Sequence, residues 1–328
     1  MSSDIIVVAL NIASPRTHWV SEALKAPLYV IKSRPPYTTL IPKLAHVINM
    51  RSPRIVLVEL PSGPLLLATI SLKKIRNFTL IADVHTGFLT ARPGLSKHSL
   101  LNYPFKPLLR YTDCILIHNK LNMHLIDVKL HKKTRVLLDP FYILREKYRD
   151  NTPSNRATML VEKIRKRYSD YLVYPASWHP DEPIDWIIGA WEKYYVRPVL
   201  VVTGRPRIKK RLSNVVLTGY LPDNDFVYLL KNSTAILSAS TSPLDMQHSA
   251  FEALALRKPI IASLTPVLYS VLSNSAIYFR NFDDKSLLDA VNKLVTNINH
   301  YRASIAKHAD RLEKEVRNQV SRLKTCRV

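Results

Sequence analysis

Short apolar runs alternate with polar segments along almost the whole chain, and this alternation restricts the possible folds more than any other feature. In the first half the runs occupy residues 4–10, 27–32, 54–60, 78–84 and 113–119, with a further one at 135–140. Between them, apolar residues recur at helical spacing at 40–48 and through 65–75. Apolar strands separated by helices are typical of a parallel sheet covered on both faces.

The alternation lapses after residue 140 and then starts again, which indicates two domains. The polar and basic residues around 145–165 predict a linker that leads into a helix. Apolar runs return at 170–177, 197–204, 214–219, 234–240, 258–263 and 275–279, with helical patterns at 184–195, 223–231, 249–256 and 284–295. A length of 328 residues also favours two domains. We predict two doubly wound α/β domains, residues 1–150 and 151–328, the second ending in a basic amphipathic helix at 301–324.

Glycines are few, and their positions indicate where a ligand would bind. Of the six, four come at or just after the carboxyl end of an expected strand: Gly63, Gly87, Gly204 and Gly219. Ligands of open parallel sheets bind at that edge. Any one of these glycines could simply turn the chain, but four at the same edge favour a ligand site.

A net charge of +23, from 48 Lys and Arg against 25 Asp and Glu, is spread over both halves of the chain. Such a field attracts nucleic acid, anionic lipid headgroups or phosphorylated substrates, and it does not choose among them. Residues 65–78, apolar and then basic, would suit peripheral contact with a membrane. The alternative is an ordinary charged surface of a thermophilic protein, which the presence of only two glutamines also favours.

Several functional classes are disfavoured by what the sequence lacks. It contains no G-x-G-x-x-G, no P-loop, no G-x-S-x-G and no H-E-x-x-H, and its eleven histidines show no ligand spacing. The two cysteines lie far apart, which excludes a disulfide framework or a cysteine zinc site. Neither a signal peptide nor a transmembrane segment is expected, so we predict a cytoplasmic protein.

The stretch from 214 to 263, "NVVLTGYLPDNDFVYLLKNSTAILSASTSPLDMQHSAFEALALRKPIIAS", carries the most specific signal. It resembles the C-terminal donor-binding domain of retaining GT-B glycosyltransferases of family 4. Glu252 matches the second of the two glutamates of that family's motif. Leu244 stands where the first is expected, with Asp245 beside it, and Arg257 replaces the usual glycine. The form "LDMQHSAFEALA" is closer to a subgroup with a D-x-M-Q loop.

Two further segments resemble the same subgroup: "SWHPDEPID" at 177–185 and "IADVHTGF" at 81–88. The resemblance implies a GT-B fold, two Rossmann-like domains facing across a cleft. It also implies transfer of a hexose from a nucleotide-diphosphate sugar to a glycan, lipid-linked or protein acceptor. Retention at the anomeric carbon would follow, with no metal and no cofactor beyond the donor itself.

The donor site can be argued from the residues themselves. The start of the 249–256 helix offers amides around Met246, Gln247, His248 and Ser249 for a diphosphate. Glu252 can accept hydrogen bonds from two ribose hydroxyls, although an acid in a first helical turn can also simply favour the helix dipole. Other donor-side candidates follow the neighbouring strands: Gly204, Arg205, Lys209 or Lys210, Gly219 and Tyr220. The arginine and lysines would neutralise phosphate charge, or the lysines form a solvated charge run.

Candidates in the first half follow expected strands too. The resemblance implies that His85, with Asp83 two residues before it, contacts the donor sugar. The D-x-H pair could be part of a metal site, but a third ligand is missing. The alternative is that His85 is a loop histidine that caps a helix. Ser14, Arg16 and His18 follow the first strand, where acceptor contacts are expected. We count His85, Asp83, Arg205 and Asp245 as the candidate catalytic residues.

Two other functions remain open at this point. A basic nucleic-acid-binding protein would account for the charge, but no reading module or stacking array is present. A GT-B relative without catalysis would account for Leu244 and Arg257.

Overall fold

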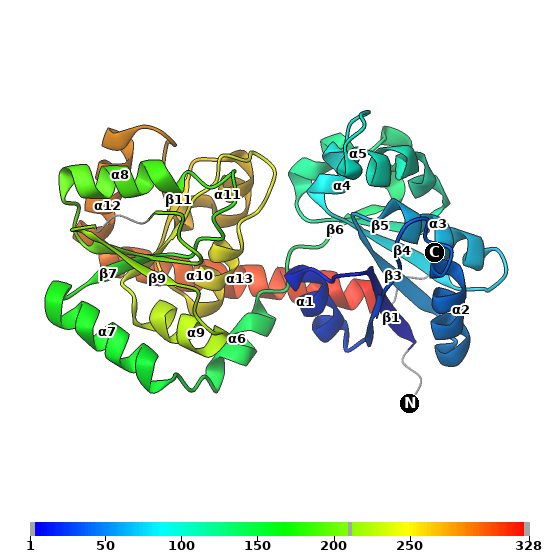
Figure 1. Cartoon of the computed structure of the whole chain (residues 1–328), viewed down its shortest axis with the longest axis horizontal. Coiled ribbons are helices and arrows are strands. Elements are labelled where there is room, and N and C mark those ends of the chain that lie inside the picture. Colours follow the sequence, from blue (N-terminus) through cyan, green and yellow to red (C-terminus); the bar gives the residue numbers. More distant parts are fainter. Residues whose placement is uncertain (1–3, 209–211, 325–328) are drawn as a thin grey trace. The chain divides into compact units, whose positions relative to one another are not determined.

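The computed structural model describes residues 4–208 and 212–324, which form two compact units (Figure 1). Unit 1 runs to Ile143 and takes in the chain again from Lys314; unit 2 is Leu144–Glu313. The boundary therefore lies at 143/144 rather than at 150, and the end of the predicted C-terminal helix belongs to unit 1 rather than to the second domain. Its contacts explain this, because Gln319 accepts a hydrogen bond from the Leu138 amide at 2.9 Å.

Unit 1 is built on a parallel sheet of strand order β2-β1-β3-β4-β5-β6. Five of the six apolar runs predicted in the first half contain one of its strands, and the run at 135–140 overlaps the last strand only at 135–136. The strands are β1 (Ile5–Leu10), β2 (Leu28–Ile31), β3 (Ile55–Leu60), β4 (Thr79–Val84), β5 (Cys114–Ile117) and β6 (Thr134–Val136). The chain passes from β1 to β2 at one edge of the sheet and then crosses to β3 on the other side of β1, so the strand order reverses between β1 and β3.

Helices join these strands. They are α1 (Pro15–Leu24), α2 (Leu40–Arg51), α3 (Gly63–Lys73), α4 (Thr86–Thr90) and α5 (Lys97–Asn102), with 3-10 turns η1 (Tyr103–Tyr111), η2 (Lys120–Leu125) and η3 (Val128–Lys133). The helical spacing at 40–48 predicted α2, whose Leu40, Leu44 and Ile48 are buried. Gly63 is required by packing, since a Cβ there would lie 2.1 Å from Phe105 Cδ2.

Unit 2 has its own parallel sheet, of order β12-β11-β10-β7-β8-β9. All six apolar runs of the second half are strands: β7 (Tyr171–Tyr174), β8 (Val199–Thr203), β9 (Val215–Gly219), β10 (Ala235–Ser238), β11 (Ile260–Ser263) and β12 (Ile277–Phe279). From β7 the sheet continues through β8 and β9 on one side and through β10, β11 and β12 on the other. The order thus reverses between β7 and β10, as in Rossmann sheets.

The helices of unit 2 include two that the sequence pattern did not reveal, at 142–149 and 266–272. They are α7 (Asn155–Tyr168), α8 (Ile184–Tyr194), α9 (Asp223–Asn232), α10 (His248–Leu256), α11 (Pro266–Leu272), the 3-10 turn η4 (Ser273–Ser275) and α12 (Asp284–Thr296). Before them, α6 (Tyr142–Arg149) occupies the start of the expected linker. Its apolar residues, Tyr142, Ile143 and Leu144, are buried although its other residues are mostly polar.

The last helix, α13 (Ile298–Lys324), is amphipathic as predicted. One stripe along it is buried: Ile305, Ala309, Leu312, Val316, Val320 and Leu323. Within the described residues, no helix combines the length and apolar character needed to cross a membrane.

Candidate functional site

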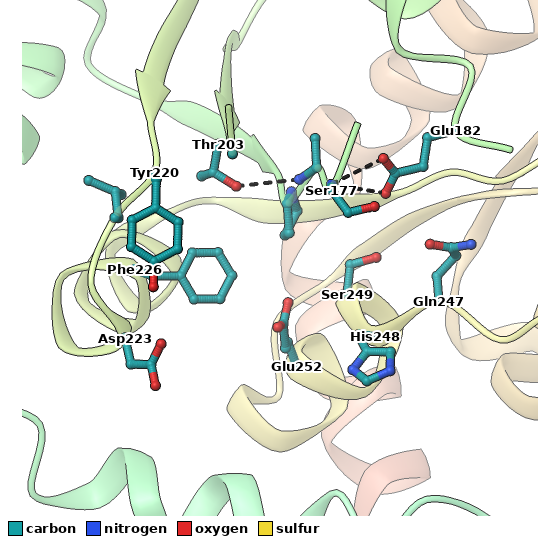
Figure 2. A pocket seen from close by; sticks show the side chains of 14 residues that line it. Ser177, Glu182, Thr203, Tyr220, Asp223, Phe226, Gln247, His248, Ser249 and Glu252 are labelled. Carbon is teal, nitrogen blue, oxygen red and sulfur yellow. Dashed lines mark hydrogen bonds between the residues drawn. The ribbon is translucent and has the colours of Figure 1, made fainter. Parts of the chain in front are cut away.

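The candidate site is a cavity of about 320 Å³ at the carboxyl edge of the second sheet. Residues after β7, β8 and β9 line it together with the starts of α9 and α10. Figure 2 shows Tyr220, Phe226 and Asp223 on one side and Gln247, His248 and Ser249 on the other, with Glu252 between them. Because the strand order reverses at β7, this is the edge at which an open α/β sheet binds ligands.

Gly204 lets two strand ends approach closely at the cavity. Its φ is +84°, and a Cβ there would lie 2.1 Å from the carbonyl oxygen of Ala176 and 2.9 Å from Trp178 Cδ1. Glycine is the residue that accepts both this conformation and this contact. Thr203, just before it, also accepts a hydrogen bond from the Ala176 amide at 3.3 Å. The two strand ends are thereby held together as one wall of the cavity.

Glu252 places an unpaired carboxylate oxygen in the cavity. The residue is half-buried, yet its Oε2 is covered and accepts no hydrogen bond from any described residue. Burial raises the pKa of Glu252 to about 8. Covering such a group without a partner costs about 1–3 kcal/mol, more for a charged one. A ligand that offers hydroxyl donors would remove this cost.

The N-terminus of α10 is also left without a side-chain cap. Gln247 occupies the cap position, but its side chain makes no capping bond and instead donates to Asp181 Oδ2 at 3.1 Å. Ser249, in the first turn, donates its hydroxyl to Ser238 Oγ at 2.9 Å. An uncapped helix start carries partial positive charge and is a ready site for an anion such as a diphosphate.

The 177–182 loop is fixed against this helix start. Glu182 accepts hydrogen bonds from the amides of Ser177 and His179, at 3.0 and 3.1 Å. Asp181 accepts from Ser240 Oγ at 3.0 Å. Burial raises the pKa of Asp181, but hydrogen bonds from His179 and Ser240 outweigh it, so that the pKa is lowered. The loop that the sequence marked by resemblance at 177–185 is therefore part of the cavity wall.

Six predicted donor-side residues line the cavity together: Gly204, Tyr220, Gln247, His248, Ser249 and Glu252. Four others are not part of its described lining: Arg205, Gly219, Asp245 and Met246. Asp245 is exposed and accepts a hydrogen bond from Ser242 Oγ at 2.7 Å. Lys209 lies outside the described residues, as does Lys210.

Sequence reasoning missed Thr203, Asp223 and Phe226 of the lining, whereas Ser177 and Glu182 lie in the segment 177–185 that was marked by resemblance but were not singled out. Pro222 before an acidic first turn marks the start of α9, and that signal could have directed attention to Asp223. Phe226, one turn later, had no signal of its own.

In unit 1, Arg16 is a buried structural residue, which corrects the prediction that it contacts an acceptor. It is 2% exposed, and its Nη2 donates to Asp83 Oδ1 and to the Leu137 carbonyl, each at 2.9 Å. Its Nη1 donates to Asp139. Asp83, a candidate catalytic residue, is itself fully buried and held by Arg16.

The other candidates of unit 1 lie nearer to the surface. His18 is exposed, and the Ser14 side chain caps α1 by accepting from the Thr17 amide. Nε2 of His85 lies 3.6 Å from Glu59 Oε1, and burial lowers the pKa of His85. The imidazole is therefore neutral at pH 7.

A third potential metal ligand, absent from the sequence pattern, is His118. Ligand atoms of Asp83, His85 and His118 lie within 4.8 Å of one another. Both oxygens of Asp83, however, accept hydrogen bonds from Arg16. A cation would have to share that carboxylate with a buried guanidinium, so the donor set fits a metal ion poorly.

The pKa of Glu252 predicts how stability changes with pH. In the unfolded chain a glutamate titrates near 4.5, whereas folding raises the pKa to about 8. Between these values the unfolded chain has lost a proton that the folded protein keeps. The contribution of Glu252 to the free energy of unfolding is therefore full below pH 4.5 and falls as pH rises, by up to about 1.4 kcal/mol per unit.

The glutamine of Glu252→Gln does not titrate, so the free energy of unfolding of this variant should lack the pH-dependent contribution of Glu252. Urea unfolding can be followed by tryptophan fluorescence, because Trp178, Trp186 and Trp191 all lie in unit 2. The stability of the variant relative to wild type should increase from about pH 5 to about pH 8 and then level off. A difference that stays constant with pH would show that Glu252 does not titrate in this range.

Comparison with known proteins agrees with this geometry. Residues 169–297 match the family model described as glycosyl transferases group 1. That segment contains β7 to β12 with the helices between them and α12; α6 and α7, which precede it, and α13, which follows it, lie outside the match. No curated protein sequence matches the chain.

Solved structures cover nearly the whole chain. A glycosyltransferase from Rickettsia africae has a TM-score of 0.66 at 14% identity, covering 98% of this chain and 93% of that one. HepE from Anabaena, in complex with UDP-glucose, scores 0.67 at 15% identity, with coverages of 97% and 91%. An E. coli trehalose-6-phosphate protein bound with UDP-2-fluoro glucose scores 0.70 at 10% identity, with coverages of 99% and 98%. The fold is GT-B.

Proposed function

We propose that the protein is a glycosyltransferase that takes a sugar from a nucleotide-diphosphate sugar and transfers it to an acceptor. The observation that carries the proposal is the unpaired carboxylate oxygen of Glu252, covered inside a cavity at the start of α10. A ribose supplies the hydroxyl donors that this oxygen lacks. The match of 169–297 to a glycosyltransferase family and the UDP-glucose complex of HepE support the same reading.

Each part of a nucleotide sugar has a complementary feature in the cavity. We assign the ribose to Glu252 and the base to the side formed by Tyr220 and Phe226, where an aromatic ring can stack. The diphosphate would meet the uncapped start of α10, at His248 and Ser249. The carboxylates of Glu182 and Asp223 disfavour placing phosphate elsewhere in this cavity.

The reaction type that we propose is the one implied by the resemblance of the donor loop to family 4 glycosyltransferases. We propose transfer of a hexose with retention at the anomeric carbon, in which positioning and stabilisation of the departing diphosphate do most of the work. The dipole of α10 and the exposed Arg205 would take up the charge of the leaving group without a metal ion. His85 and Asp245 remain candidates for contacts to the donor sugar.

A thermal-shift panel of UDP-, GDP-, ADP- and CMP-sugars tests this function. A ligand at 100 times its dissociation constant stabilises a protein by about 2.7 kcal/mol, which gives a readily measured rise in melting temperature. We expect one base to give such a rise and the others a smaller one. A panel without any rise would contradict the proposed donor site. A rise with duplex DNA that disappears at high salt, and none with the sugars, would favour nucleic-acid binding instead.

A further inference from the structure

The cavity of unit 2 holds a further carboxylate, that of Asp223, at the end that the base of a nucleotide would occupy. Figure 2 shows Asp223 on the same side of the cavity as Tyr220 and Phe226. Glu252 lies between this side and the start of α10. A nucleoside diphosphate has its phosphates, ribose and base in this same order. With the diphosphate at α10 and the ribose at Glu252, the base therefore reaches the side of Asp223.

The first turn of α9 directs Asp223 toward the cavity. Asp225, the other acid of this turn, is buried and accepts hydrogen bonds from the amide and the hydroxyl of Ser154, each at 2.8 Å. Ser154 is the cap residue of α7, so Asp225 faces that helix. Residues two apart on a helix of about 3.6 residues per turn point to nearly opposite sides. Asp223 therefore faces away from α7 and lines the cavity.

The carboxylate of Asp223 is free to bind a ligand. It makes no hydrogen bond and no ion pair with the residues that the structure describes. The described lining of the cavity also contains no lysine or arginine. The phenol of Tyr148 on α6 stays protonated, because burial and then the charges of Glu252 and Asp223 raise its pKa. Asp223 favours the dipole of α9, but this leaves both of its oxygens able to accept hydrogen bonds.

Among the common bases, guanine matches a free carboxylate best. Its N1–H and its 2-amino group lie side by side and can donate to the two oxygens of one carboxylate. Uracil has a single N–H between two carbonyl oxygens, which a carboxylate repels. Adenine and cytosine each carry one amino group beside a ring nitrogen that accepts hydrogen bonds. One oxygen of the carboxylate would face the lone pair of that nitrogen.

We propose that the donor cavity selects a guanine nucleotide, and that Asp223 recognises it by accepting hydrogen bonds from N1–H and the 2-amino group. The inference rests on the proposed function, because it takes the ligand of this cavity to be a nucleotide. Tyr220 is 68% exposed, so its ring can stack on the purine while Asp223 binds the edge. The donor is then a GDP-sugar. The HepE complex contains UDP-glucose, so UDP is the competitor against which the selection is measured.

Isothermal titration calorimetry of the full chain with GDP, IDP, UDP and ADP tests the selection. IDP is GDP without the 2-amino group, so it measures one of the two hydrogen bonds. We expect GDP to bind about tenfold more tightly than UDP or ADP, and about tenfold more tightly than IDP. UDP that binds as tightly as GDP would overturn the choice of guanine and leave the donor site standing. If none of the four bound, the donor site itself would be contradicted, and this inference with it.

Asp223→Ala assigns the selection to one side chain. The variant should bind GDP and IDP equally and lose about tenfold of the preference for GDP over UDP. If Asp223 acted only on the α9 dipole, the melting temperature would fall and the GDP-to-IDP ratio would stay at its wild-type value, which would overturn the contact. Asp223→Asn keeps the size of the side chain and should also lose the preference. Asp289→Ala, at an exposed position of α12, is the control and should keep both ratios.

Discussion

Above about pH 8, where Glu252 is ionised, Glu252→Ala should weaken binding of the donor nucleotide by about 100-fold. Hydrogen bonds to a charged group contribute about 1.5–3 kcal/mol each, and we expect two ribose hydroxyls to donate to this carboxylate. Even at the lower value their loss corresponds to two powers of ten in the dissociation constant. Isothermal titration calorimetry with the nucleoside diphosphate chosen by the panel measures the effect. Removal of a buried acid whose pKa is raised should not reduce stability at neutral pH, so the loss is specific to binding.

The matched control is Glu162→Ala, which removes an exposed glutamate of the same unit. It should bind the nucleotide as wild type does. Because the free protein holds Glu252 protonated below about pH 8, binding of a ribose to the carboxylate should also release a proton. Wild-type affinity would then rise with pH up to about 8, whereas Glu252→Gln would show a flat profile. An alanine variant with wild-type affinity would remove Glu252 from the site.

Arg16→Met should destabilise unit 1 by about 3–5 kcal/mol, the largest stability effect that we expect from one substitution. The change leaves the carboxylates of Asp83 and Asp139 buried beside each other without their cation. Native-state hydrogen exchange of the β4 amides reports on unit 1 alone and measures the fall in the free energy of opening. A fall below about 1 kcal/mol would mean that the pairs add little beyond a surface ion pair.

Two further variants test whether the unpaired acids, rather than the change from arginine to methionine itself, cause the loss of stability. Arg34→Met changes an exposed arginine of the same unit and should alter stability by less than about 0.5 kcal/mol. Adding Asp83→Asn to Arg16→Met should recover part of the loss, because one of the two unpaired charges is then gone. If the double variant were less stable than the sum of the single changes, repulsion between the acids would not be the cause.

The strands could be predicted because a buried parallel strand must be apolar on both faces. The run at 54–60 became β3, every residue of which is buried, and the run at 234–240 contains β10. Helix α6 was missed because its one buried turn, at 142–144, is too short for a periodic pattern. The return of the chain end to unit 1 depends on contacts such as Gln319 with Leu138, which are 181 residues apart. No local pattern carries such information.

The two sites differ in how far local sequence could reveal them. Glu252 stands in a continuous motif, so both its position and its role as a ligand contact could be proposed in advance. Arg16 was misassigned because its partners, Asp83 and Asp139, lie 67 and 123 residues further along the chain. The cavity that Glu59 lines at the carboxyl edge of the first sheet depends on the placement of β1 beside β3, and no single segment of the sequence determines the strand order.

Hydrogen exchange of the full chain with and without the nucleoside diphosphate chosen by the panel tests the donor site most directly. We predict slower exchange at the amides of the first turn of α10, around His248 and Ser249, and at the wall formed by 175–177 and 203–204. The amides of β1, β3 and β4 of unit 1 should not change, because the nucleotide is assigned to unit 2. Protection confined to unit 1, or a complex that leaves α10 unprotected, would contradict the assignment of this cavity as the nucleotide-sugar site.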